Sequence, residues 1–169
     1  MTVAPSAEVL IDALGLEPHV EGGYYRRIYS GDDVPMLVLA EGQRAALTSI
    51  QYLLTATSPV GHFHRNRSTI VHYFQAGDPL HYRLIDAEGT LTECILGANV
   101  VAGEQLTLVV PGGVWKSSEL QATAVFGYGL IAEAVTPGFE FAEMELGDAA
   151  RLARDFPQHS SLFNCFCSR

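Results

Sequence analysis

Short apolar, β-branched and aromatic runs alternate with turn sequences over most of the chain. The turn sequences are SPVG, AGDP, DAEG, VAGE and PGG, and they contain glycine, proline and aspartate, which are common in tight turns. Such short runs at nearly regular spacing are typical of a sandwich or a barrel, so we predict an all-β fold. The runs predict strands at Leu47–Thr55, Ser68–Gln75, Leu80–Ile85, Leu91–Leu96, Gln105–Val110 and Ala122–Val135.

Helices are predicted only near the two ends of the chain. Ser6 is a candidate N-cap for an amphipathic helix that ends at Gly15, and Asp148 is a candidate N-cap for a second helix. No repeat, low-complexity tract or linker interrupts the sequence. We therefore expect one domain over residues 1–169, with a helix over about 6–15, a barrel over about 20–145 and a C-terminal helix over about 148–156.

Composition narrows the classes of function. The 169 residues carry 19 acidic and 10 basic side chains, and the net charge of −9 argues against a nucleic-acid-binding surface. No apolar stretch approaches the roughly 20 residues of a membrane span, and the N-terminal segment lacks the basic start of a secretory signal. With 3 cysteines and no signal, we expect reduced thiols and a cytoplasmic protein. For the pair Cys165 and Cys167 we favour a frayed or packed tail over a metal site, because no second thiol pair accompanies it.

The densest polar cluster is the segment GHFHRNRSTIVHYFQAG, residues 61–77. His62 and His64 are two residues apart, so on a strand they would share one face at a spacing of roughly 6–7 Å. Both imidazoles would then reach one metal ion or one substrate. His72 lies beyond a turn and could return to the same cavity on the neighbouring strand. These three histidines are therefore candidate pocket residues.

Two further segments place a charged residue in apolar surroundings. In VVPGGVWKSS, residues 109–118, Lys116 is the only lysine of the chain and follows Trp115 and a Pro-Gly-Gly turn. Glu133 is the only charge within the apolar run GLIAEAV. It lies either on the open face of an edge strand or in a cavity, and alternation does not decide between them. Inside a cavity it would be an acid or base with a raised pKa, or a partner for Lys116.

The segment EPHVEGGYYRR combines His19 and Glu21 with a pair of glycines that leads into an aromatic, arginine-rich strand. We expect a structural role here, because glycine allows close backbone approach and alternate side chains face core and solvent. Arg26 or Arg27 offers a second role, since a guanidinium group can hold an anionic substrate through two hydrogen bonds.

Together these segments resemble the cupin superfamily. GHFHRNRSTIVHYFQAG resembles the first cupin motif, and GEQLTLVVPGGVWK resembles the second, which is built around a Pro-x-Gly turn. The resemblance is more specific to the fifth cupin family, and it covers most of the chain, from residue 16 to about 157. It implies a cupin double-stranded β-helix (jelly-roll barrel) with a ligand cavity in its mouth, and a homodimer. The blocks that carry it are, in order, LEPHVEGGYYRRIYS, TSIQYLLT, FHRNRSTIVHYFQAGDPL, VVPGGVWK, VTPGFEFAEMELG and DFP.

Two of the four ligand positions of a metal-binding cupin are changed in this chain. His62 and His64 match the first two ligands, but the position of the glutamate ligand falls near Thr69 or Ile70, where no carboxylate occurs. The last histidine position holds Lys116, whose ammonium group has no lone pair and would repel a divalent cation. We therefore favour no metal cofactor. A divalent metal held by His62, His64 and His72 remains an alternative.

The favoured function is a small-molecule enzyme of the isomerase, epimerase or lyase type, with metal-independent acid/base chemistry. In this hypothesis His64 abstracts or relays a proton, Lys116 stabilises a developing enolate or a substrate carboxylate, and Glu133 orients or neutralises one of them. Tyr52 or Tyr73 serves as the acid. The resemblance to cupins suggests this role, because the metal-free cupins that epimerise sugar nucleotides use a tyrosine as the acid. The candidate ligand-binding residues are His62, His72, Tyr73, Trp115 and Arg26.

Two other functions use the same pocket. One is a non-catalytic barrel that binds a small apolar or anionic ligand. The other is a metal-dependent cupin, such as an iron or manganese oxygenase, that uses the three histidines of the segment 61–77.

Overall fold

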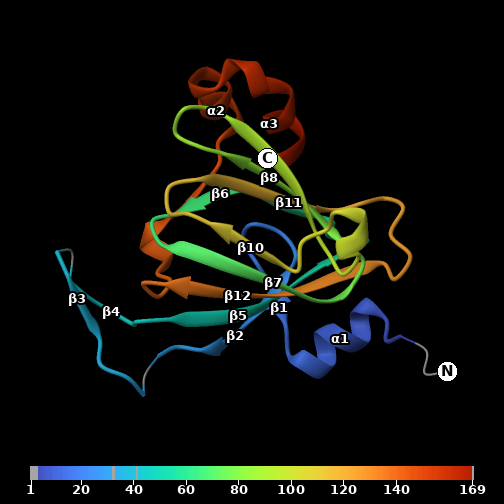
Figure 1. Ribbon diagram of the computed structural model, residues 1–169, viewed down its shortest axis with the longest axis horizontal. Helices are drawn as coiled ribbons and strands as arrows, with labels where there is room; N and C mark the ends of the chain where they lie inside the picture. The colour runs from blue at the N-terminus through green and yellow to red at the C-terminus, as the bar shows by residue number, and fades with distance from the viewer. Residues whose placement is uncertain (1–3, 32, 41, 169) are drawn as a thin grey trace.

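Two antiparallel sheets face each other across a shared interior (Figure 1). The computed structural model describes residues 4–31, 33–40 and 42–168. The first three residues of the expected domain and its last residue lie outside this range. The sheets confirm the prediction of an all-β fold with short helices near its ends.

The larger sheet contains, in spatial order, β1 (Glu17–Pro18), β2 (Tyr24–Tyr29), β5 (Thr48–Thr55), β12 (Tyr128–Thr136), β7 (Thr69–Gly77) and β10 (Thr107–Val110). The smaller sheet contains β13 (Met144–Leu146), β6 (Val60–Asn66), β11 (Trp115–Leu120), β8 (Leu80–Ile85) and β9 (Leu91–Leu96). A separate hairpin, β3 (Leu37–Leu39) and β4 (Gly42–Arg44), projects from the body of the molecule (Figure 1).

The helices begin and end near the positions that their caps predict. The side chain of Ser6 accepts a hydrogen bond from the backbone at the start of α1 (Ala7–Leu14), and Gly15 ends this helix in the left-handed conformation. Asp148 caps α2 (Ala149–Asp155) in the same way. A further helix, α3 (Ser160–Phe166), follows α2 and was not predicted. Short 3₁₀ turns lie at Val100–Ala102, Phe141–Glu143 and Pro157–His159.

Two expectations about strands need correction. The predicted strand Ala122–Val135 begins only at Tyr128, because the carboxylate of Asp78 accepts three backbone N–H groups between residues 125 and 127 and holds that segment as a loop. The strands β6 and β11 were absent from the predicted set, because their histidine, lysine and serine side chains obscure the apolar alternation. These two polar strands carry much of the site described below.

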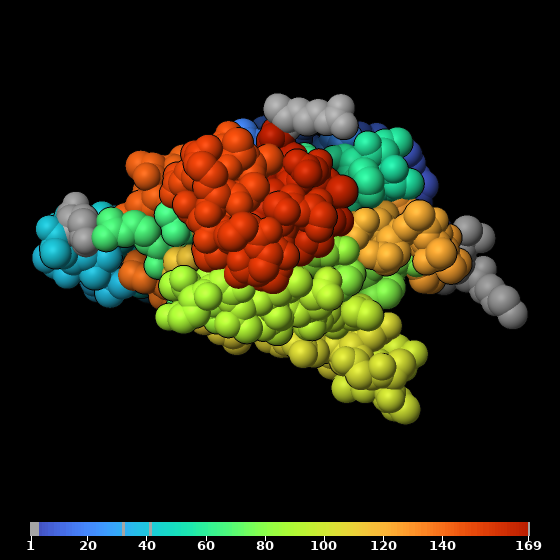
Figure 2. Space-filling model, turned by 90° about the horizontal axis from the view of Figure 1, so that it is seen from above, coloured from blue at the N-terminus to red at the C-terminus, as the bar shows by residue number. Residues whose placement is uncertain are grey.

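Apolar side chains fill one end of the interior and cover the outer face of each sheet. The interior cluster includes Tyr52, Leu54, Leu80, Tyr82 and Ile131. The helices α2 and α3 cover the outer face of the smaller sheet, as seen from above in Figure 2, and α1 packs on the larger sheet. Among the described residues, no helix is both long and apolar enough to cross a membrane.

The C-terminal tail packs onto its own chain. Phe163 is fully buried and its ring meets that of Phe63 on β6 edge-on, at 5.4 Å between centroids. Cys167 is buried in the same cluster, and burial raises the pKa of its thiol to about 11. Of the two expected alternatives, a frayed or a packed tail, the structure shows the packed one for residues up to 168.

Replacing Phe163 by alanine should lower the free energy of unfolding by about 3–5 kcal/mol, because it leaves a cavity between α3 and β6. Phe126, which is half exposed, is the matched control, and its alanine variant should lose less than about 1.5 kcal/mol. Urea denaturation followed by circular dichroism measures both. Equal losses for the two variants would show that α3 does not contribute to the core.

Candidate active site

Strand register places charged side chains inside the molecule at the end opposite the apolar cluster. On the larger sheet, one cross-strand row runs through Arg27, Ile50, Glu133 and His72 on four adjacent strands. On the smaller sheet, His64 of β6 pairs directly with Lys116 of β11. His64, His72, Lys116 and Glu133 are all at most 5% exposed. Glu133 thus lies in the cavity, not on the open face of an edge strand.

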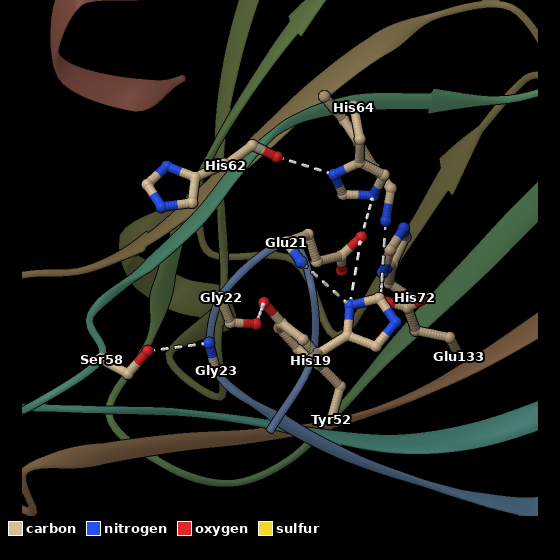
Figure 3. Close-up of polar contacts among 11 residues, drawn as sticks. His19, Glu21, Gly22, Gly23, Tyr52, Ser58, His62, His64, His72 and Glu133 are labelled. Carbon is tan, nitrogen blue, oxygen red and sulfur yellow. Dashed lines mark hydrogen bonds and ion pairs between the residues drawn. The ribbon is translucent and has the colours of Figure 1, made fainter. Parts of the chain in front are cut away.

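The loop between β1 and β2 inserts a second carboxylate, Glu21, between the sheets (Figure 3). Gly22 has a φ of +99°, and a Cβ atom there would lie 2.1 Å from the carbonyl oxygen of Val60, so only glycine fits. The N–H of Gly23 donates to the hydroxyl of Ser58 at 2.8 Å. The carbonyl oxygen of Glu21 accepts the N–H of His62 at 2.6 Å. The two glycines and these bonds fix the loop against β6.

Glu21 and His64 form a buried pair that holds a proton. Nδ1 of His64 lies 2.7 Å from the carbonyl oxygen of His62, which can only accept, so Nδ1 carries a hydrogen. Nε2 of His64 lies 2.8 Å from Oε2 of Glu21. Burial alone would raise the pKa of Glu21, but the charge of His64 and its hydrogen bond outweigh this, and the pKa is lowered. The pair is therefore a carboxylate beside an imidazolium.

Glu133 is held by two partners on the opposite side of the cavity. Its Oε1 lies 3.6 Å from Nζ of Lys116 and 3.2 Å from Nδ1 of His72. Burial favours the neutral acid, but Lys116 and then His72 reverse this, so the pKa of Glu133 lies below its ordinary value of 4.5. Burial and the nearby ammonium group lower the pKa of His72, which is therefore neutral.

His19 and Tyr52 support the loop that carries Glu21. Nδ1 of His19 accepts the N–H of Glu21 at 3.4 Å, and burial lowers the pKa of this histidine. The hydroxyl of Tyr52 donates to the carbonyl oxygen of Gly22 at 2.8 Å. Burial, and then the charges of Glu21 and Glu133, raise the pKa of Tyr52 well above 10. Tyr52 is thus a neutral phenol whose proton is already engaged.

Charged groups of both sheets line a small cavity, in which the centres of water-sized molecules have about 30 Å³ of space. Its wall combines charged and apolar side chains, which suits a small molecule with both kinds of surface. The lining residues are His19, Glu21, Tyr25, Arg27, Ile50, His64, Asn66, Ile70, Glu133, Val135 and Phe139. Lys116 and His72 lie behind Glu133 and contact it.

The expectation that His62 and His64 share one face is wrong. Lys116 pairs with His64, whereas Ser118 pairs with Gly61, so His62 and Phe63 both lie opposite a single residue of β11. This β-bulge shifts the alternation by one residue. Phe63 therefore faces the C-terminal helices, and His62 points away from His64 and Glu21 (Figure 3).

Other candidate ligand-binding residues also lie outside the cavity, because each neighbours a residue that points inward. Tyr73 follows His72 and is 44% exposed. Trp115 precedes Lys116 and packs in the outer cluster with the C-terminal helices, where the guanidinium group of Arg65 covers it. Arg26 faces outward and donates to the carbonyl oxygen of Leu14 at 2.9 Å, at the end of α1.

Sequence reasoning missed Glu21, His19 and the cavity-lining role of Asn66, and assigned the EPHVEGGYYRR segment a structural role. The glycines do have that role, but the loop they shape delivers Glu21 to the site. The available signal was a glutamate directly before a Gly-Gly pair, which indicates a polar side chain carried on a tightly packed turn. Arg27, offered as an alternative to Arg26, is the arginine that lines the cavity.

Residues 8–147 match the Cupin_5 family, described as Cupin superfamily (DUF985). The chain belongs to this cupin family. An uncharacterized protein of Saccharomyces cerevisiae is 36% identical to it, and the match covers 82% of this chain and 73% of the yeast protein. The prediction from the sequence motifs is thus confirmed.

Solved structures agree with the cupin fold. A hypothetical protein from Leishmania major superposes with a TM-score of 0.90 at 32% identity, covering 98% of this chain and 100% of that one. A protein from Shewanella oneidensis superposes with a TM-score of 0.86 at 33% identity, covering 98% and 99%. Oxalate decarboxylase from Bacillus subtilis matches with a TM-score of 0.54 at 14% identity, over 88% of this chain and 36% of the decarboxylase, which supports the fold alone.

The residues at the cupin metal position do not fit a metal ion. His62 points away, both nitrogens of His64 are engaged by Glu21 and a carbonyl oxygen, and an ammonium group lies opposite. Among the described residues, no group of three or more histidine, cysteine, aspartate or glutamate side chains is arranged to hold a metal. The set His62, His64 and His72 therefore does not form a ligand sphere in this cupin.

Replacing Glu133 by glutamine should lower the free energy of unfolding by about 3–5 kcal/mol, because it leaves the buried Lys116 ammonium without a counter-charge. Adding Lys116→Met should recover part of this loss. Glu93, a half-exposed acid on β9, is the matched control, and its glutamine variant should change stability by less than about 1 kcal/mol. Chemical denaturation of the four proteins tests this, and a double variant no more stable than Glu133→Gln would contradict it.

The same comparison has a defined pH dependence. Because the folded-state pKa of Glu133 is depressed, its contribution is fully present above the unfolded value of 4.5 and is lost as the pH falls through the lower folded value. The stability difference between the wild type and Glu133→Gln should therefore be constant above about pH 4.5 and shrink below it.

Proposed function

We propose that this cupin is a small-molecule enzyme that moves a proton to or from carbon without a metal, as an isomerase, epimerase or lyase does. The observation that supports this is a pair of buried carboxylates, Glu21 and Glu133, that line one cavity and are each backed by a histidine. Paired ionisable groups with displaced pKa values in a cavity are typical of acid/base sites.

Glu21 and His64 act as one acid–base unit in this proposal. The described contacts of Glu21 engage its Oε2, which leaves Oε1 available to a substrate in the cavity. Glu21 removes a proton from a carbon beside a carbonyl group, becomes a neutral acid, and returns the proton to carbon in the product. The imidazolium of His64 already carries hydrogen on both nitrogens, so in this proposal it stabilises the Glu21 carboxylate and does not itself carry the proton.

Glu133, Lys116 and His72 form the opposite wall. Glu133 orients the substrate, and Lys116 keeps it ionised and adds positive potential behind it, which favours an enolate that develops in the cavity. Lys116 does not line the cavity, so its effect on the substrate is electrostatic. Tyr52 positions the loop that carries Glu21. In this proposal the Glu21–His64 unit, and not Tyr52, supplies the acid.

The test is deuterium uptake from D₂O into phenylpyruvate, 2-oxobutyrate and acetoacetate, followed by proton NMR. The wild type should accelerate exchange in at least one of these keto acids, and Glu21→Gln and His64→Asn should slow the catalysed rate by about 10²–10⁴-fold. His62→Asn is the matched control, since it alters a histidine on the same strand that points away from the cavity. A metal chelator should leave the rate unchanged.

Thermal denaturation of each variant shows whether it is folded. No catalysed exchange in any of the three keto acids, or full activity in folded Glu21→Gln, would contradict the proposal. Loss of activity with the chelator would contradict its metal-independent part. Binding of these acids without exchange would favour the second candidate, a non-catalytic binding barrel, which the paired carboxylates Glu21 and Glu133 also suit.

We further propose a homodimer, as the resemblance to the family implies. The projecting hairpin supports it, because Met36 and Val38 are 46% and 80% exposed, and an isolated two-stranded hairpin is only marginally stable in water. Light scattering that gives the mass of a single 18.3 kDa chain would contradict this. The cytoplasmic location stays a prediction.

A further inference from the structure

The mouth of the cavity carries a positive charge that no described acid neutralises. The guanidinium carbon of Arg27 lies 5.8 Å from the centre of the Phe139 ring, and the side chain lines the cavity. Within the described part of the chain, no ion pair is formed by Arg27. In a protein of net charge −9, an exposed arginine with no described acidic partner beside an aromatic ring suits an anionic ligand.

The inner end of the cavity has the opposite character. Oδ1 of Asn66 is buried, has no hydrogen-bond partner among the described residues, and belongs to a side chain that lines the cavity. The carboxylates of Glu21 and Glu133 line the same cavity and are at least as deeply buried as Asn66. All three groups accept hydrogen bonds, so a ligand presents its anionic group to Arg27 and its donor or acidic hydrogen to the inner end.

Flat side chains shape the space between these ends. The ring of Phe139 meets that of Phe141 edge-on at 5.0 Å, and Phe141 stacks with His19 at 6.3 Å. Phe139 is fixed because its N–H donates to the hydroxyl of Thr48 at 2.9 Å. The aromatic rings beside the cavity favour a planar ligand.

Register also limits the length of the ligand. Arg27 and Glu133 both pair with Ile50, so they lie two strands apart in one row. Two strand spacings correspond to roughly 10 Å between their backbones, and both side chains project from the same face of the sheet. A ligand with one ring and a carboxylate is long enough to contact both of them.

We propose that the cavity takes a small planar carboxylic acid and that Arg27 is the residue that selects it. The carboxylate binds Arg27 beside Phe139, and the remainder of the molecule reaches Glu21 and Glu133. This inference rests on the proposed function, because it names the substrate class for the same site.

Ligand-observed NMR titrations with benzoate, benzamide and cyclohexanecarboxylate test the inference without turnover. Benzoate and benzamide have the same shape and differ in charge, and the wild type should bind benzoate at least about tenfold more tightly. Arg27→Gln should abolish this preference. Arg26→Gln is the matched control, because Arg26 is the adjacent arginine on β2 and faces α1, so its variant should keep the preference.

Equal affinity of the wild type for benzoate and benzamide, or a preference that persists in Arg27→Gln, would overturn the role of Arg27. Cyclohexanecarboxylate bound as tightly as benzoate would overturn the requirement for a planar ligand. Failure of the proposed function is distinguishable: benzoate binding that depends on Arg27, together with no deuterium exchange, removes the catalysis and leaves the ligand class.

Discussion

Charge neutralisation inside a low-dielectric interior is the constraint on which the rest of this molecule depends. Two carboxylates lie between the sheets, and each would be strongly unfavourable there without a cation. Glu21 receives the imidazolium of His64, and Glu133 receives the ammonium of Lys116. The apolar cluster in the interior and the cluster under the C-terminal helices both pack next to these ion pairs. The core is therefore built around a polar centre.

This charge balance also explains why the cupin centre differs from a metal site. A metal-binding barrel would place a divalent cation among its ligands, and the cation would neutralise nearby carboxylates. Here Lys116 supplies positive charge from the strand position directly opposite His64. The side chains themselves therefore balance the charges, and both carboxylates remain available to the cavity.

Sequence patterns predicted the barrel, the capped helices and four of the buried polar residues, His64, His72, Lys116 and Glu133. They failed where the structure departs from regular alternation. The β-bulge at His62 is set by pairing between strands distant in sequence, and nothing local to the motif reveals it. Glu21 reaches the site through a loop whose path depends on contacts with β5 and β6. Neighbouring side chains on a strand point to opposite faces of the sheet. This rule alone predicts that Trp115 and Lys116 cannot both face the cavity, and the same holds for Tyr73 and His72.

The apolar layer formed by Tyr52, Tyr82 and their neighbours closes one end of the barrel. A molecule that contacts Glu21 shares the cavity with Phe139 and the other side chains that line it. A cavity of this size holds one small molecule at a time, so a second molecule cannot bind until the first has left. Such a chamber suits a rearrangement of one compound into another, and it makes the departing compound a direct competitor of the arriving one.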